Sequence, residues 1–115
     1  MWKQRKEATL EKHGLLLCPE CNLENLHQGN ATIYERGEDG DYTTVIAQNG
    51  HEVMATKFPS EETHNPSSRR HGLIIEFTCE SCHHGYGYEV RPAYTDPFRL
   101  AIYQHKGYTL MEWVS

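Results

Sequence analysis

The sequence predicts a mainly β, antiparallel domain in which a long hairpin excursion separates two Cys-x-x-Cys turns. Three observations predict it. Apolar and polar residues alternate along several short segments, which is typical of strands with one buried face. Glycine-containing turn signals, above all Asn49-Gly50, separate these segments. The four cysteines form two widely separated pairs, Cys18 with Cys21 and Cys79 with Cys82.

Length and composition indicate one folded, polar domain. A chain of 115 residues can build one core, and 37% hydrophobic with 23% charged residues is not the composition of a disordered chain. The net charge of −5 disfavours a generally basic nucleic-acid coat. No segment approaches the ~18 apolar residues of a membrane span, and no apolar segment follows the cationic start of the chain, as a secretory signal requires. We therefore expect a cytoplasmic protein without a membrane partner.

The first part of the chain divides into an arm and the start of the domain. Residues 1–14 have no regular apolar stripe and are expected to form a flexible or short helical arm, while residues 15–115 form the single domain. Residues 15–17, three leucines, are expected to form a short buried strand that leads into the first cysteine pair.

The segment between the cysteine pairs is expected to form strands at 31–36, 42–48 and 51–58, with a turn at 37–41 and a hairpin at Asn49-Gly50. We expect one face of this hairpin to carry Val45, Ala47, Val53 and Ala55. Residues 59–72 are rich in polar residues and proline and predict a long loop, a type of segment that is often functional.

The remaining strands are expected at 73–79, 100–105 and 108–114. Leu73, Ile75 and Phe77 alternate on one side of the first, and Lys106-Gly107 joins the last two as a second hairpin. Residues 86–97 predict an irregular aromatic segment. The sum is about six or seven strands.

The cysteine pairs predict one structural zinc ion bound by Cys18, Cys21, Cys79 and Cys82. Two Cys-x-x-Cys turns supply four soft thiolates, which suit tetrahedral Zn²⁺ at about 2.3 Å per Zn–S bond and leave no open catalytic position. Disulfides would require an oxidising compartment, and a thioredoxin-like motif would require a βαβ pattern that the sequence lacks. Iron could occupy the same four thiolates.

Several blocks of the chain resemble small zinc-ribbon proteins that are encoded by bacteriophages and by prophage-type bacterial loci. The blocks are Cys18-Pro19-Glu20-Cys21 with Leu26-His27, Arg36-Gly37-Glu38-Asp39, Asn65-Pro66-Ser67-Ser68-Arg69-Arg70, Gly72-Leu73, Phe77-Thr78-Cys79-Glu80 and Gln104-His105-Lys106-Gly107, with an end near Trp113. The resemblance implies a one-domain, zinc-ribbon-like fold in the bacterial host cytoplasm, and it implies no activity. His83-His84 departs from the family pattern, in which glycine commonly follows the second pair, so a histidine could compete as a ligand.

Two polar segments predict a surface that binds a macromolecule. Its residues are Arg69, Arg70, His71, His105 and Lys106, since arginine and lysine bind phosphate and histidine adds hydrogen-bonding edges. Tyrosines could add stacking faces for unpaired bases; they are Tyr86, Tyr88, Tyr94, Tyr103 and Tyr108.

A structural interpretation of the same segments stays open. The arginines could instead pair with Glu61, Glu62 or Glu76, and the residues from Asn65 to Ser68 could build a rigid turn whose hydroxyls satisfy backbone groups.

These features favour a non-enzymatic protein that binds nucleic acid or a nucleic-acid-processing complex. The alternative is a protein-binding module that inhibits or adapts a host enzyme, in defence or transcription, for which an acidic surface suits a basic target. An enzyme is disfavoured, because all four thiols are assigned to metal and a ββα-metal nuclease would need a helix after His71. No small-molecule substrate is predicted. The open sheet edges could pair with a second copy as a homo-oligomer.

Overall fold

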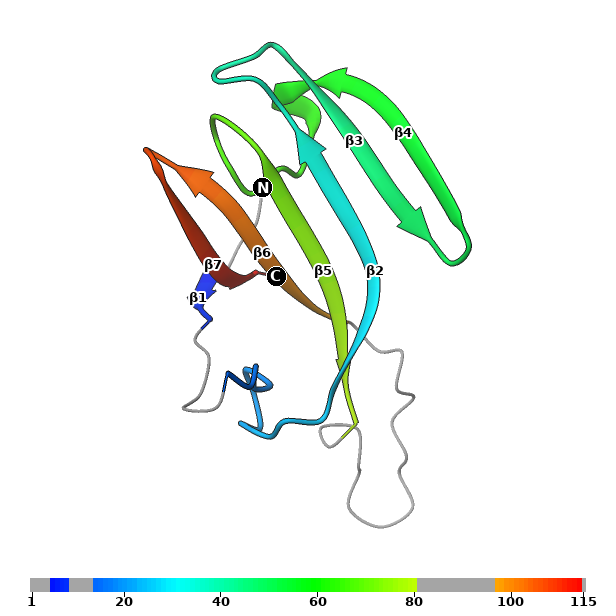
Figure 1. Cartoon of the computed structure of the whole chain (residues 1–115), viewed down its shortest axis with the longest axis vertical. Coiled ribbons are helices and arrows are strands. Elements are labelled where there is room, and N and C mark those ends of the chain that lie inside the picture. The colour runs from blue at the N-terminus through cyan, green and yellow to red at the C-terminus, as the bar shows by residue number, and fades with distance from the viewer. Residues whose placement is uncertain (1–4, 9–13, 81–96, 115) are drawn as a thin grey trace.

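In the computed structural model, the described residues form seven strands that pair into one sheet (Figure 1). The structure describes residues 5–8, 14–80 and 97–114. The strands are β1 (Arg5–Glu7), β2 (Leu26–Glu35), β3 (Tyr42–Asn49), β4 (Glu52–Pro59), β5 (Gly72–Cys79), β6 (Phe98–His105) and β7 (Tyr108–Val114). A 3₁₀ turn, η1 (Ser60–Glu62), follows β4. The described part of the chain contains no helix of the length and apolarity that crossing a membrane requires.

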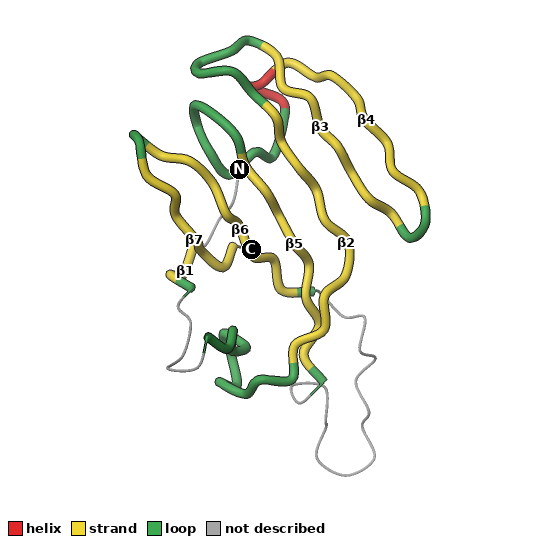
Figure 2. Tube along the Cα trace, viewed as in Figure 1, coloured by secondary structure: helices red, strands yellow, loops and turns green. Residues whose placement is uncertain are grey.

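The strand order is β1-β7-β6-β5-β2-β3-β4 (Figure 2). Every neighbouring pair is antiparallel. Strands β2 to β4 form one meander and β5 to β7 another, and the β2–β5 pair joins the two. The prediction of a mainly β, antiparallel protein is confirmed, and the described residues contain seven strands.

Both predicted hairpins are present, and their loops show why. Gly50 has φ +66° in the β3–β4 loop, whereas Lys106 (φ 44°) and Gly107 (φ 89°) are both left-handed, as a type I′ turn requires.

The prediction that Val45, Ala47, Val53 and Ala55 share one face of the first hairpin is wrong. Asn49 pairs with Glu52, so Val45 lies opposite Thr56 and Val53 lies opposite Gln48. A two-residue loop pairs odd positions with even ones, which places Val45 and Ala47 on one face of the sheet and Val53 and Ala55 on the other.

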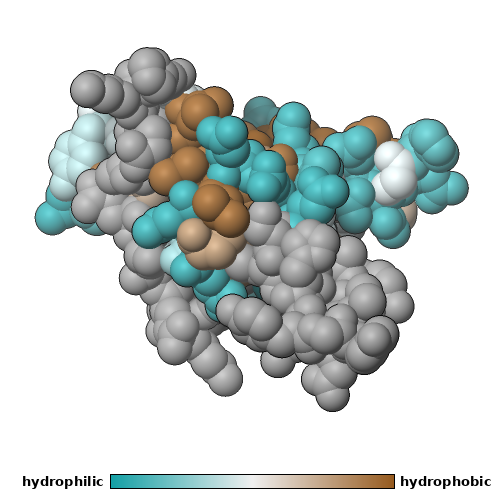
Figure 3. Space-filling model, turned by 90° about the horizontal axis from the view of Figure 1, so that it is seen from below, coloured by the Kyte–Doolittle hydropathy of each residue, from teal (hydrophilic) through white to brown (hydrophobic). Residues whose placement is uncertain are grey.

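The two faces of the sheet carry two separate apolar clusters. One face buries Tyr34, Ile74, Ala101, Tyr103 and Val114. The other buries Ala8, Phe77, Leu100 and Trp113, and the Trp113 ring meets the rings of Phe77 and Phe98 edge-on at 5.9 and 6.3 Å. The expectation that Leu73, Ile75 and Phe77 share one side of their strand is confirmed by the β5–β6 register. Viewed from the end that holds the cysteines, apolar side chains gather near the centre with hydrophilic ones beside them (Figure 3).

Four local expectations need correction or lie outside the described residues. Arg5–Glu7 form strand β1, paired with β7, where an arm or helix was expected, because the free edge of β7 offers them hydrogen-bond partners. Of residues 15–17 only Leu16 makes an isolated bridge, and Leu15 is 44% exposed, so the buried strand is wrong. The loop at 59–72 begins with η1. The irregular segment expected at 86–97 lies outside the described residues except for Pro97.

Candidate functional site

Three cysteines meet at the end of the β2–β5 pair. The Sγ atoms of Cys18, Cys21 and Cys79 all lie within 4.8 Å of one another, and those of Cys21 and Cys79 are 3.5 Å apart. Cys18 and Cys79 are fully buried. Four sulfurs around a tetrahedral zinc ion at about 2.3 Å lie about 3.8 Å from each other. The three thiols therefore have the chemistry and the spacing to hold a metal ion. Cys82, the fourth expected ligand, and the neighbouring His83 and His84 lie outside the described residues.

A tight turn brings Cys18 and Cys21 together. The Cys18 N–H donates to the Leu23 carbonyl at 2.9 Å, and the Asn22 N–H donates to the Cys18 carbonyl at 3.0 Å. Asn22 closes the turn with φ 58°, a left-handed conformation that asparagine adopts more readily than most residues. Strand β5 supplies Cys79, which pairs in the sheet with Leu26 at the start of β2. The cluster thus links the turn before β2 to the last residue of β5.

The second predicted segment, residues 65–71, is a turn organised around Ser67, which is 3% exposed. Its Oγ donates to the Gln104 carbonyl at 2.7 Å and accepts from the N–H groups of Arg69 (3.2 Å) and Arg70 (3.0 Å). The Asn65 side chain accepts from the Ser67 N–H at 3.0 Å and donates to the Arg70 carbonyl at 2.8 Å. The expectation of a turn whose hydroxyls satisfy backbone groups is confirmed for Ser67, whereas the contact found at Ser68 uses its backbone carbonyl.

Gly72 lets this turn pack against the start of β5. A Cβ at this position would collide with Asn65 Oδ1 and would lie 2.8 Å from Pro66 Cδ, closer than real Cβ contacts. The Asn-Pro pair and the glycine are therefore one packing unit, which fixes the direction in which the loop enters β5.

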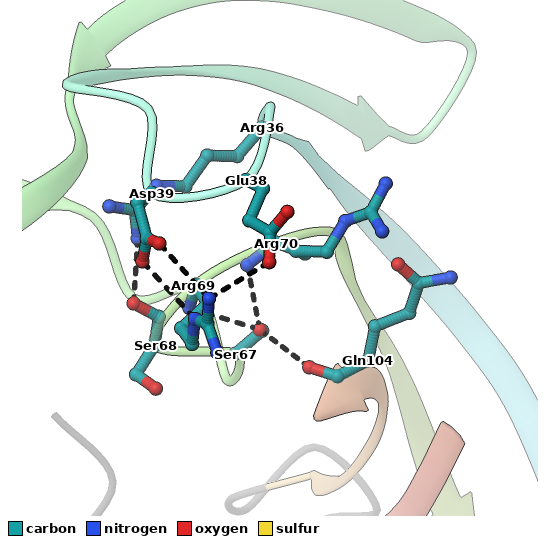
Figure 4. Close-up of polar contacts among 8 residues, drawn as sticks. All are labelled: Arg36, Glu38, Asp39, Ser67, Ser68, Arg69, Arg70 and Gln104. Carbon is teal, nitrogen blue, oxygen red and sulfur yellow. Dashed lines mark hydrogen bonds and ion pairs between the residues drawn. The ribbon is translucent and has the colours of Figure 1, made fainter. Parts of the chain in front are cut away.

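Arg69 is held by two carboxylates of the turn between β2 and β3 (Figure 4). Its guanidinium donates to Glu38 at 2.8 Å and to both oxygens of Asp39 at 3.2 and 3.1 Å. Local pairing of an arginine was one expectation, but the partners are not those expected. Among the described residues, Glu61 and Glu62 make no ion pair with Arg69 or Arg70, and Glu76 lies 3.7 Å from Arg99 in a salt bridge. Arg69 therefore holds two loops together and is not available as a binding cation.

Arg36 and His71 strengthen the same junction. Arg36 donates from its side chain to the carbonyls of Gly40 (2.7 Å) and Ser68 (2.9 Å), and its backbone N–H donates to His71 Nδ1 at 3.0 Å. An acceptor Nδ1 means a neutral ring whose proton is on Nε2. His71, predicted as a contact residue, thus serves the fold. His105 packs edge-on against Tyr108 at 5.6 Å.

The Arg69 contacts determine how the stability of this junction depends on pH. The hydrogen bond from Arg69 lowers the pKa of the Asp39 carboxyl below its ordinary value of 3.8. A lowered pKa in the folded state means that the ionised form stabilises the fold above about pH 4, and that this contribution is lost as the pH falls through the lowered value. We expect the difference in unfolding free energy between the wild type and Asp39→Asn to be constant from about pH 7 to 5 and to shrink below about pH 4. Urea titrations across this range measure it, and a difference that grows in acid would contradict the assignment.

Arg70 and Lys106 face a common hollow between the loop and the β6–β7 turn. The hollow has a volume of about 330 Å³, and its lining also includes Arg69, Glu38, Gln104 and Gly107. Arg70 and Lys106 are exposed, and within residues 5–8, 14–80 and 97–114 their side chains make no hydrogen bond or ion pair. The Gln104 Oε1 atom is buried without a hydrogen-bond partner in the described structure. Two cations from distant segments of the chain thus line the same hollow.

Sequence reasoning missed the residues that build this site around the cations. Ser67 and Gln104 belong to the motif blocks noted above. The residues around them do not indicate that the Ser67 hydroxyl donates to the Gln104 carbonyl. Glu38 and Asp39 lie about 30 positions before Arg69, and only the β2–β5 pairing brings them together. Of the tyrosines expected to stack on bases, Tyr103 is buried and Tyr108 is 55% exposed, while Tyr86, Tyr88 and Tyr94 lie outside the described residues.

Comparisons with known protein families, with curated proteins and with solved structures find no match to this chain.

Proposed function

We propose that the chain is a non-enzymatic, zinc-stapled β protein of the phage or prophage type that binds nucleic-acid phosphates through Arg70 and Lys106. The observation that carries the binding proposal is the hollow that these two cations share with Gln104. A side chain that already pairs with carboxylates gains little from a phosphate, whereas exposed cations without a partner in the described chain are free to exchange solvent for one. Arg69 contributes indirectly, since it fixes the loop that carries Arg70.

The local charge explains how an acidic protein could bind phosphate. The chain carries a net charge of −5, but the residues at the hollow are Arg69, Arg70 and Lys106 against Glu38, with Asp39 bound to Arg69 nearby. The hollow is therefore net positive by about one charge, and screening at physiological salt confines the influence of more distant acids to about 8 Å.

For the metal, we propose zinc bound by Cys18, Cys21 and Cys79 with Cys82 as the fourth ligand. Four thiolates leave no position for a substrate, so the ion serves the fold, in a zinc-ribbon-like arrangement. A reducing cytoplasm would keep the thiols available for metal.

Fluorescence anisotropy with single- and double-stranded oligonucleotides, measured as salt is raised, tests the binding. We expect Arg70→Gln and Lys106→Asn each to weaken binding about tenfold and to lower the salt slope by about one. Asparagine is chosen at position 106 because the backbone there is left-handed (φ 44°).

The matched control is Lys57→Gln, which removes a cation on β4 whose Nζ lies over the Tyr42 ring at 5.2 Å, outside the hollow. It should bind like the wild type. Absence of binding at low salt by the zinc-loaded protein would reject nucleic acid and favour the protein-binding alternative, in which an acidic surface meets a basic host enzyme.

A further inference from the structure

Strand β4 leaves an open hydrogen-bonding edge eight residues long. Among the described residues it pairs only with β3, and it forms one outer side of the sheet (Figure 1). Every residue from Glu52 to Phe58 is exposed, including Val53 (68%), Met54 (63%) and Phe58 (42%). Soluble proteins usually shorten, charge or cover such an edge, because it is a template for another strand. At the other edge of the sheet, β1 is only three residues long.

The register shows which backbone groups this edge offers. Asn49 and Glu52 close the β3–β4 hairpin across a two-residue loop, and in such a hairpin the closing pair is hydrogen-bonded, after which bonded and non-bonded pairs alternate. The even-numbered residues of β4 therefore turn their N–H and C=O groups toward β3. Val53, Ala55 and Lys57 turn theirs outward. The next outward position is Pro59, which has no N–H to donate, so the open ladder ends there.

We propose that β4 pairs antiparallel with β4 of a second copy of the chain, about a two-fold axis at Ala55, so that the sheets of the two copies become continuous. Val53 then pairs with Lys57 of the partner subunit, and Ala55 pairs with Ala55 of the partner subunit. Each copy contributes three outward donors and three outward acceptors, and all are satisfied. The proposal is independent of nucleic-acid binding, since no residue of the hollow takes part in it.

Charge and side-chain pattern favour a second copy as the occupant. The hairpin from residue 42 to residue 59 contains one acid, Glu52, and one base, Lys57, so two copies of a chain with net charge −5 would meet where each is neutral. In the antiparallel pairing neither charge lies opposite its own kind. Met54 and Phe58 share one face of β4, and the two-fold axis brings the same two residues of both copies onto one face, where they cover each other.

Analytical ultracentrifugation of the full-length, metal-loaded protein between about 1 and 300 µM tests the dimer. We expect a concentration-dependent dimer for the wild type. Ala55→Pro removes an N–H that points away from β3, so it should raise the dissociation constant at least about tenfold through two lost hydrogen bonds per dimer. Ala55→Ser retains the N–H and should dimerise like the wild type.

Amide hydrogen exchange of the wild type gives a second test that does not depend on the folding of a variant. The N–H groups of Val53, Ala55 and Lys57 should become protected as the concentration rises, whereas those of Met54 and Thr56 should be protected throughout. A monomer at every concentration with rapid exchange at the three outward amides would overturn the proposal, and the edge would then belong to a different partner or to water. An Ala55→Pro protein that dimerises as tightly as the wild type would overturn it too. Oligonucleotide binding is read separately, so loss of one activity does not imply loss of the other.

Discussion

Removal of the zinc ion proposed for the cysteine cluster is expected to unfold the protein. Structural zinc sites of this type contribute about 10 kcal/mol or more of apparent binding free energy, which exceeds the net stability of most small domains. The sheet has one apolar cluster on each face and no second sheet among the described residues, so the link between the first turn and β5 carries a large share of the stability. Chelator titration followed by circular dichroism measures the loss of structure.

Cys79→Ser should show the same effect without a chelator. Cys79 is fully buried, so the variant loses a ligand and leaves a hydroxyl in a closed site. Metal analysis should fall from about one zinc per chain to well below one. The control is His27→Ala: His27 Nε2 lies 3.2 Å from a Glu80 oxygen beside the cluster, but the ring is exposed and should leave zinc content unchanged. One tightly bound equivalent of metal after the double substitution Cys79→Ser and Cys82→Ser would refute the four-thiolate site.

Ser67→Ala is expected to lower the unfolding free energy by about 3 kcal/mol, roughly 1 kcal/mol for each of three hydrogen bonds. The substitution removes the Oγ atom that receives the N–H groups of Arg69 and Arg70 and that donates to the Gln104 carbonyl. Because the site is almost fully buried, water cannot replace these bonds without opening the loop. Urea denaturation measures the change.

Ser68→Ala is a matched control for the neighbouring position. Ser68 is exposed, and the contact found there uses its backbone carbonyl, which accepts from Arg36 and survives the substitution. Its effect should stay within about 0.5 kcal/mol. Equal losses for the two serines would show that the turn is not organised around Ser67. A looser turn should also weaken oligonucleotide binding by Ser67→Ala, because Arg70 is carried on it.

Most strands and both hairpins of this protein can be predicted from its sequence, because the patterns that indicate them are local. Alternation marks β3 to β7, and the left-handed positions at Gly50 and Lys106-Gly107 coincide with glycine turn signals. The face on which Val53 lies is not predictable in this way, because it depends on whether the loop has an odd or an even number of residues, which strand propensity does not specify. A three-residue edge strand such as β1 is too short to show alternation.

The sequence predicts the cysteine cluster of the candidate site but not the partners of Arg69, for a physical reason. Cysteine is rare and its pairs have metal-ligand spacing, so the cluster needed no knowledge of topology. The partners of an arginine are different, because the chain has 16 acidic residues and any of them could serve. Glu38 and Asp39 are the partners of Arg69 because the sheet places the β2–β3 turn against the loop before β5.

The joint between the two meanders has a consequence for the rate at which this chain folds. Within each meander, strands pair with their sequence neighbours, so hairpins can form early and at low entropic cost. The β2–β5 joint is different, since it places His27 beside Glu80, 53 positions away in the chain. Closing that loop is expected to be slow, because non-local pairing costs chain entropy before contacts repay it, and a metal ion that binds both cysteine pairs in the unfolded chain would speed it. We therefore expect refolding to be faster when zinc is present from the start than when it is added after the hairpins have formed.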